Sequence, residues 1–179
     1  MEDLPYVYNE ILTIRGKNLD LRKLKIADLV EIFKMAELDC DAPDRLIFKT
    51  HWGELHAMVE MDATGSWIDL QVFQLHLVLL PEFWVTLEDL KKIYGNIPTF
   101  FNYFFRFEDG REVTQTYYLF SRNLMAVYCP EEDRVVGLEY IVPELLESDE
   151  DEDQDFIEKV LEAIESLRFQ TVVQLATPQ

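Results

Sequence analysis

The sequence predicts an α+β fold, with an antiparallel sheet built from two meanders and with N-terminal, middle and C-terminal helices flanking it. Three observations lead to this prediction. Strand-like segments come in two groups, amphipathic segments lie before, between and after these groups, and short turn signals separate neighbouring strands. Since parallel strands need a long crossover between them, this order favours antiparallel pairing. The 179 residues are expected to form a single domain (1–179), with a flexible acidic loop at about residues 146–154.

The N-terminal helix is expected between about Asp20 and Glu37. Its apolar residues recur at the spacing of one buried helix face: Ile26, Leu29, Val30, Phe33 and Ala36. The preceding segment, residues 6–15, alternates only loosely between apolar and polar residues. It could be a short strand or a capping arm, and both alternatives stay open.

The first meander is expected to follow this helix. Strand-like runs cover residues 46–48 and 55–61, and a tight turn near Gly53 joins them. Residues 62–65 favour a turn, and a long strand, bulged or bent, is expected over residues 67–80. Together these runs predict about three strands.

The middle helix is marked at both of its ends. Thr86 is the expected N-cap, and Asp89, three residues later, completes a capping-box pattern. Gly95 is the expected C-cap, because helices often end at a glycine. The sequence therefore predicts a short helix between these two caps.

The second meander begins with the aromatic run at residues 100–107, in which aromatic side chains fall on both faces of the predicted strand. A strand that is apolar on both sides is typically central, so we expect both of its faces to be covered. Asp109-Gly110 is a strong hairpin signal. The strands expected after it cover residues 113–120, 124–129 and 135–142.

The C-terminal helix is expected to begin at Asp153 or Gln154. Its apolar residues form a single stripe: Ile157, Val160, Leu161, Ile164 and Leu167. The final segment, Thr171–Leu175, could form a short edge strand.

The formal net charge is −19, and the acids crowd toward the C-terminus, where residues 144–165 contain eleven Asp or Glu and one base, Lys159. Such a charge repels nucleic acid phosphates and anionic lipid and attracts basic partners. We therefore expect the partner to be another protein with a basic surface, and we expect no nucleic acid binding. We also expect no membrane insertion, because polar residues interrupt the longest apolar stretch.

The two cysteines, Cys40 and Cys129, are far apart and form no CxxC pair, which makes a disulfide framework unfavourable. The first residues are acidic and lack the basic and apolar regions of a signal peptide. These observations favour a cytoplasmic location.

No motif indicates catalysis or a cofactor. His51, Glu54 and His56, with His76 as the remaining histidine, suggest a metal site, but their spacing differs from that of a helical HExxH motif, and ordinary sheet histidines are favoured. Cys129 lies at a strand end without a nucleophile motif, and the isolated glycines form no phosphate-binding loop. We therefore expect no enzyme, no metal and no cofactor, and an enzyme with an unrecognised site is kept as the third hypothesis.

The candidate partner-binding residues are acids of the expected loop and of the solvent-exposed face of the last helix. We call them the acidic strip: Glu147, Asp149, Glu150, Asp151, Glu152, Asp153, Asp155, Glu158, Glu162 and Glu165. One interpretation is a solvated loop that aids solubility. The other is a docking strip that steers a basic partner, with the helix acids extending the strip onto a rigid element.

The first half of the chain contains, in order, the helix at Ile26–Ala36, a strand pair around Gly53 and the strand with Leu70, Val72 and Phe73. The second half contains Phe101-Asn102, Arg106-Phe107, the Asp109-Gly110 hairpin and a closing helix. Over about residues 20–170, this topology resembles the YbjN-like group of small bacterial proteins, which share the fold of type III secretion chaperones. The resemblance implies a non-enzymatic helper that binds segments of other polypeptides, often as a dimer.

The leading hypothesis is therefore a non-enzymatic, acidic protein-binding module that acts as a chaperone or adaptor. The alternative is an immunity or anti-defence inhibitor that neutralises a basic toxin or nuclease, because small size, acidity and the lack of catalytic motifs fit it equally well. A homodimer is compatible with either hypothesis.

Overall fold

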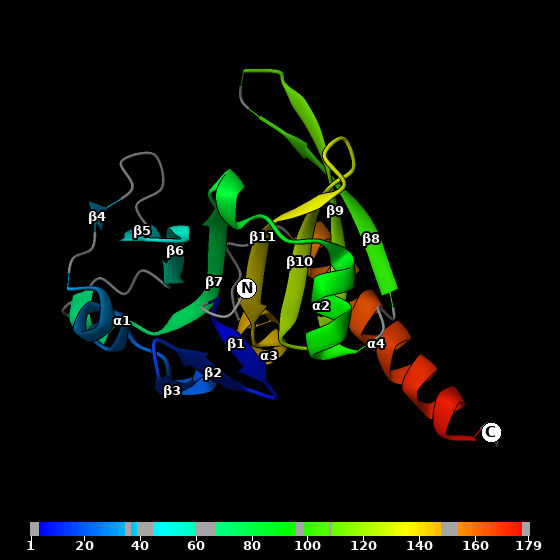
Figure 1. The fold of residues 1–179 in the computed structure, drawn as a ribbon, viewed down its shortest axis with the longest axis horizontal. Coiled ribbons are helices and arrows are strands. Elements are labelled where there is room, and N and C mark those ends of the chain that lie inside the picture. The colour runs from blue at the N-terminus through cyan, green and yellow to red at the C-terminus, as the bar shows by residue number, and fades with distance from the viewer. Residues whose placement is uncertain are drawn as a thin grey trace.

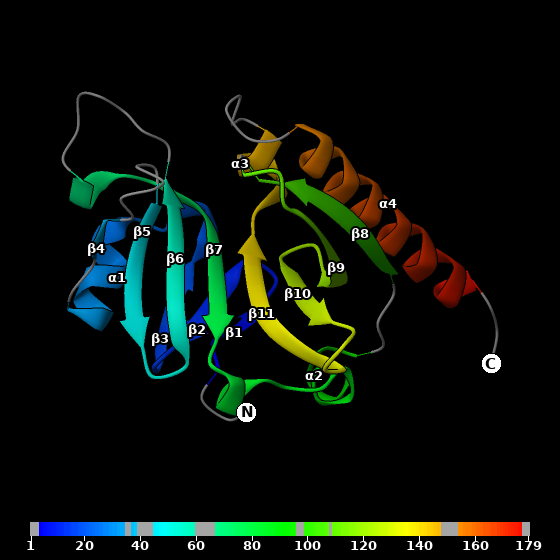
Figure 2. The same cartoon turned by 90° about the horizontal axis from the view of Figure 1, so that it is seen from above.

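The structure is a computed structural model. The residues that it describes are 4–34, 37–38, 45–59, 67–95, 99–107, 109–147 and 154–176. Its strands form a three-stranded and an eight-stranded antiparallel sheet, and helices lie on both faces of the larger sheet (Figures 1 and 2). This arrangement confirms the predicted α+β fold.

The small sheet at the N-terminus consists of β1 (Tyr6–Tyr8), β2 (Ile11–Ile14) and β3 (Lys17–Asp20). Arg15 and Gly16 have φ angles of 48° and 77°, as a tight two-residue hairpin between β2 and β3 requires. Leu12 and Ile14 are buried, so this sheet contributes to the core. Of the two alternatives that the sequence left open, the segment is therefore strand.

The large sheet has the strand order β4-β5-β6-β7-β11-β10-β9-β8. Its strands are β4 (Glu37–Leu38), β5 (Arg45–Thr50), β6 (Gly53–Val59), β7 (Val72–Leu79), β8 (Thr99–Arg106), β9 (Glu112–Ser121), β10 (Leu124–Cys129) and β11 (Arg134–Ile141). β4–β7 and β8–β11 are two meanders, each continuous in sequence, and the pairing of β7 with β11 joins them. The two predicted meanders are therefore present within one sheet.

The α-helices are α1 (Ile26–Phe33), α2 (Leu87–Tyr94), α3 (Pro143–Glu147) and α4 (Gln154–Ala176), and the short 3₁₀ turns are η1 (Leu21–Lys23), η2 (Trp67–Asp69) and η3 (Pro81–Phe83). The large sheet divides the core into two parts. One face of the large sheet packs against α1, α2 and the small sheet, and the other packs against α3 and α4. No helix in the described part of the chain is both long and apolar enough to cross a membrane.

The middle helix, α2, has the caps that the sequence predicts. The Thr86 hydroxyl accepts a hydrogen bond from the Asp89 N–H at 3.0 Å, and the Asp89 carboxylate accepts one from the Thr86 N–H at 3.2 Å. Gly95 has a φ of 93° and donates its N–H to the Lys91 carbonyl at 2.8 Å. The capping box and the C-cap glycine are thus confirmed.

The N-terminal helix is shorter than expected. Its first residues, Leu21–Lys23, form η1, which the Asp20 carboxylate caps by accepting the Arg22 N–H at 3.0 Å. α1 ends at Lys34, which has a left-handed φ of 68°. Likewise, the strand expected over residues 67–80 begins as η2 and becomes β7 at Val72. The turn expected at residues 62–65 lies outside the described residues.

Two other predictions about strands are wrong. The aromatic run does not form a central strand, because among the described residues β8 is the last strand of the sheet and a helix covers one of its faces. The segment Thr171–Leu175 is not an edge strand, because α4 continues through it to Ala176.

In the expected acidic loop, α3 extends to Glu147, and residues 148–153 lie outside the described residues.

Candidate protein-binding surface

Part of the acidic strip lies on a helix. Asp149, Glu150, Asp151, Glu152 and Asp153 lie outside the described residues, and Glu147 is the last residue of α3. Asp155, Glu158, Glu162 and Glu165 all belong to α4, and all four are exposed. The structure therefore places four acids of the strip along one rigid element.

α4 is held against the end of the large sheet by aromatic packing. The Phe156 ring lies 5.1 Å from the Tyr103 ring and 5.5 Å from the Tyr117 ring, both in edge-on geometry. Val160 and Ile164 continue the buried stripe that the sequence predicts. Because each aromatic pair adds to the burial of apolar area, α4 is fixed beside β8 and β9. Figure 2 shows α4 running along β8.

β8 is the exposed edge of this region. It pairs with β9 from Thr99 to Arg106 and, within the described part of the chain, with no other strand. Phe101 and Tyr103 face α4, whereas Phe100 and Phe104 point to the opposite face and are 58% and 51% exposed. An edge of unpaired backbone groups beside exposed aromatic rings is a template for a further strand. We call β8, Phe100, Phe104 and the four acids of α4 the β8–α4 surface.

The basic side chains at the tip of the β8–β9 hairpin are already paired. The Arg106 guanidinium donates to the Glu112 carboxylate at 2.8 Å, and that of Arg111 donates to Asp109 at 2.6 Å. Arg111 also lies over the Phe107 ring at 5.0 Å. Between Asp155 and Glu165, α4 contains four acids and one base, Lys159, so this stretch gives the β8–α4 surface a negative formal charge.

The histidines that suggested a metal site are divided by the fold. The His51 ring lies against Trp52 in a tilted arrangement with ring centres 4.4 Å apart, away from the other two histidines. His56 and His76 are paired across β6 and β7, and His76 is paired with Glu139 on β11. Among the described residues, no group of three or more His, Cys, Asp or Glu side chains could hold a metal ion.

These side chains instead form a polar row across the sheet. The Glu54 carboxylate lies 3.3 Å from His56, and Glu139 lies 3.6 Å from His76. Burial, together with the nearby charges of His56 and Arg45, lowers the pKa of His76 to about 4. His76 is therefore neutral at pH 7, and its contact with Glu139 is polar rather than ionic. Glu139 carried no sequence signal, since one acid in a chain this acidic is uninformative.

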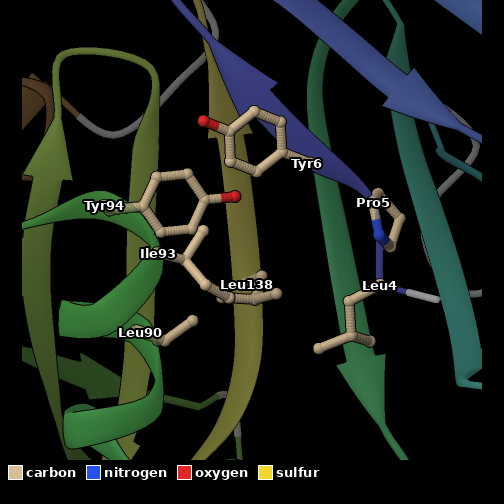
Figure 3. Close-up of a pocket in the computed structure, with 7 residues that line it drawn as sticks. All are labelled: Leu4, Pro5, Tyr6, Leu90, Ile93, Tyr94 and Leu138. Atoms are coloured by element: carbon tan, nitrogen blue, oxygen red, sulfur yellow. The ribbon is translucent and has the colours of Figure 1, made fainter. Parts of the chain in front are cut away.

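A small apolar pocket lies on the opposite face, between the N-terminal segment and α2 (Figure 3). Its volume is about 270 Å³, and the Tyr6 and Tyr94 rings stack in its wall with centres 5.2 Å apart. Burial raises the pKa of Tyr94 to about 12, and the Tyr94 hydroxyl already accepts the Val7 N–H at 3.4 Å. This pocket offers apolar contact and no group that exchanges a proton near neutral pH.

Comparisons with protein-family models, with curated proteins and with solved structures found no match to this chain. The resemblance to the YbjN-like group therefore stays a prediction. The site residues rest on the geometry of the β8–α4 surface alone. Its acids carry a sequence signal in their charge run, whereas the exposure of Phe100 and Phe104 does not, because it depends on which strand ends the sheet.

Proposed function

We propose that this protein binds an extended, basic segment of another protein at the β8–α4 surface, as a chaperone- or adaptor-like module. The observation that carries the proposal is an aromatic edge strand lying beside an acidic helix. The segment adds a strand to β8, so that backbone hydrogen bonds supply affinity. Its apolar side chains cover Phe100 and Phe104, and its Lys or Arg side chains face the acids of α4.

Charge favours a basic partner over a second copy of this chain. A copy paired on the same edge would bring two acidic helices together, each within a chain of net charge −19. Like charges at an interface oppose association, whereas opposite charges raise the association rate. The acids therefore act mainly on the rate of encounter, and the strand edge and aromatic rings act on the lifetime of the complex.

The proposal is tested with a fluorescent peptide of alternating Lys and Val, as long as the eight residues of β8. Stopped-flow anisotropy at low salt gives the association and dissociation rates, and a peptide of alternating Glu and Val is the control. We expect the Lys-Val peptide to bind, with an association rate that falls as salt rises. Equal binding of both peptides, or of neither, would contradict the proposal.

Two sets of variants separate the contributions. The triple variant Glu158→Gln, Glu162→Gln and Glu165→Gln should slow association about threefold to tenfold at low salt. Its matched control neutralises three exposed glutamates elsewhere, Glu31, Glu82 and Glu132, and should have a smaller effect.

The contribution of the aromatic rings is tested by measuring the dissociation rate of the peptide. The double variant Phe100→Ser and Phe104→Ser should accelerate dissociation, because it removes the apolar contacts of the bound strand while leaving the charges of α4 in place. An unchanged dissociation rate would exclude the exposed face of β8 from the interface. A self-associating protein, seen as a dimer by sedimentation, would instead identify a second copy as the occupant.

A further inference from the structure

A second cavity lies on the face of the sheet that carries the polar row. Its volume is about 370 Å³, within the range of pockets that bind small molecules. Strands β5, β6, β7 and β11 contribute side chains from one side, and the tip of the β8–β9 hairpin contributes them from the other. Phe105 and Phe107 from the hairpin and Phe156 from α4 supply three aromatic walls.

The polar lining includes two amides with unused hydrogen-bonding capacity. Gln74 is 6% exposed, and its amide makes no hydrogen bond with any residue that the structure describes. The Gln115 carbonyl accepts the Tyr117 hydroxyl at 2.6 Å, and no hydrogen bond from its NH₂ group is present within the described ranges. Both amides line the cavity, where a ligand that donates and accepts hydrogen bonds can pair with them.

Among the described residues of the lining, there is one basic and one acidic side chain besides His76. Arg45 contributes one positive charge and Glu139, which is 4% exposed, contributes one carboxylate. His76, the third titratable group of the floor, is neutral at pH 7 because its pKa is lowered to about 4. The described lining residues thus combine aromatic walls, amides and opposite formal charges, which suits an uncharged ligand with both donors and acceptors.

We propose that this cavity binds an uncharged, planar nitrogen heterocycle of the nucleobase type. The ring lies between the Phe105, Phe107 and Phe156 side chains, and its edge pairs with the Gln74 and Gln115 amides. A glutamine amide can donate to and accept from adjacent positions of a purine edge, and stacking on aromatic rings is favourable for every base. A phosphate on the ligand weakens binding, because the chain is strongly acidic.

The experiment uses adenine as the probe, titrated into the full chain and followed by calorimetry up to about 10 mM. Indole, which is planar but lacks an acceptor edge, and adenosine monophosphate are titrated in parallel. We expect adenine to bind with one-to-one stoichiometry, and both other compounds to bind at least about fivefold more weakly.

Variants test the assigned contacts. Gln74→Met keeps the volume of the side chain and should weaken adenine binding about fivefold, without affecting indole. Phe107→Ser should weaken binding at least about fivefold, because a stacking wall is lost. Phe100→Ser is the matched control, since Phe100 lies on the other face of the sheet and should leave adenine binding unchanged.

The outcomes are distinct. Absence of adenine binding, or equal binding of adenine and indole that Gln74→Met does not change, would overturn the proposal. If Gln74→Met fails to fold, Gln115→Met on the hairpin provides the same test. The inference is independent of the β8–α4 surface, because Phe100→Ser affects peptide binding alone and Gln74→Met affects adenine binding alone.

Discussion

Gly53 leaves no room for a side chain. Its φ is 143°, and an added Cβ would lie 2.0 Å from the carbonyl oxygen of Val78 on β7. Gly53→Ala must therefore separate β6 from β7, and we expect it to lower the free energy of unfolding by about 3 kcal/mol. Urea denaturation measures this loss.

Gly110 provides the control for this prediction. Its φ is 87°, but no atom of the described residues lies within 4 Å of an added Cβ. Gly110→Ala should lower the free energy of unfolding by only about 1 kcal/mol, because alanine is less stable than glycine in the left-handed backbone conformation. Equal losses for the two variants would show that the close approach to Val78 is not what destabilises Gly53→Ala.

His76 makes folding sensitive to pH. Because its pKa is about 4 in the folded chain and near 6.5 when unfolded, the unfolded state binds the extra proton between these values. The contribution of His76 to the free energy of unfolding is therefore present above about pH 6.5, and it is lost as the pH falls toward 4. Between about pH 7.5 and about pH 5, this loss is about 2 kcal/mol.

The measurement compares the pH dependence of urea denaturation in the wild type and in His76→Gln, because other groups titrate in both proteins. The variant should lack the loss that is specific to His76. His51→Gln, which changes an exposed histidine, should keep it. Parallel pH profiles for the wild type and His76→Gln would contradict the assignment.

At the residue scale, sequence reasoning succeeded where the determining chemistry is local. The capping pair Thr86 and Asp89, the C-cap Gly95 and the hairpin glycine Gly110 were all identified, because each depends on near neighbours in the chain. The exposure of Phe100 was not predicted, because it depends on the position of β8 in the sheet.

Among the elements, α4 has its aromatic anchor in Phe156, next to the buried Ile157, Val160 and Ile164. Phe156 contacts four aromatic rings from β8 and β9, with centres 5.1 to 6.4 Å away. Phe156→Ala should lower the free energy of unfolding by about 3 kcal/mol. It should also accelerate amide hydrogen exchange along α4 more than in β10 and β11.

Phe104→Ala is the matched control, because Phe104 is exposed on the other face of β8. It should change stability by less than about 0.5 kcal/mol. If α4 kept its protection in Phe156→Ala, the helix would be held by contacts other than this ring.

The ends of elements were harder to predict than their existence. The start and the apolar stripe of α4 were anticipated, but its continuation through Thr171–Leu175 was not. Local strand propensity is a weak guide where a preceding helix can simply continue. The residues of β1–β3 were ambiguous for a similar reason, since short strands carry little periodicity.

For the whole molecule, the net charge of −19 predicts a salt effect on folding. Self-repulsion among the acids destabilises the compact state and is screened by added ions. Raising sodium chloride from about 0.02 M to about 0.5 M should increase the free energy of unfolding by on the order of 1 kcal/mol. Urea denaturation at several salt concentrations measures this increase.

The triple variant of Glu158, Glu162 and Glu165 serves again here, because it removes three negative charges from α4. Its stability should depend less on salt than that of the wild type. A stability that falls with salt in both proteins would mean that attractive ion pairs outweigh the repulsion.

The fold class and both meanders followed from the order of strands and helices, but the order of strands across the sheet did not. β5 and β6, and likewise β8 and β9, are linked by short turns, which sequence patterns reveal. β7 and β11 are distant in the chain, and no local signal specifies that they pair. The β8–α4 surface follows from that pairing, since it leaves β8 at the edge.

The β7–β11 pairing also orders the folding pathway. Each meander pairs strands that are neighbours in sequence, whereas joining β7 to β11 closes a loop that contains α2 and strands β8–β10. The entropic cost of closing such a loop makes this junction the late, high-contact-order step. The two meanders are therefore natural fragments. A chain divided between α2 and β8 would present complementary edges, β7 on one piece and β11 on the other, through which the halves could reassemble as a split protein.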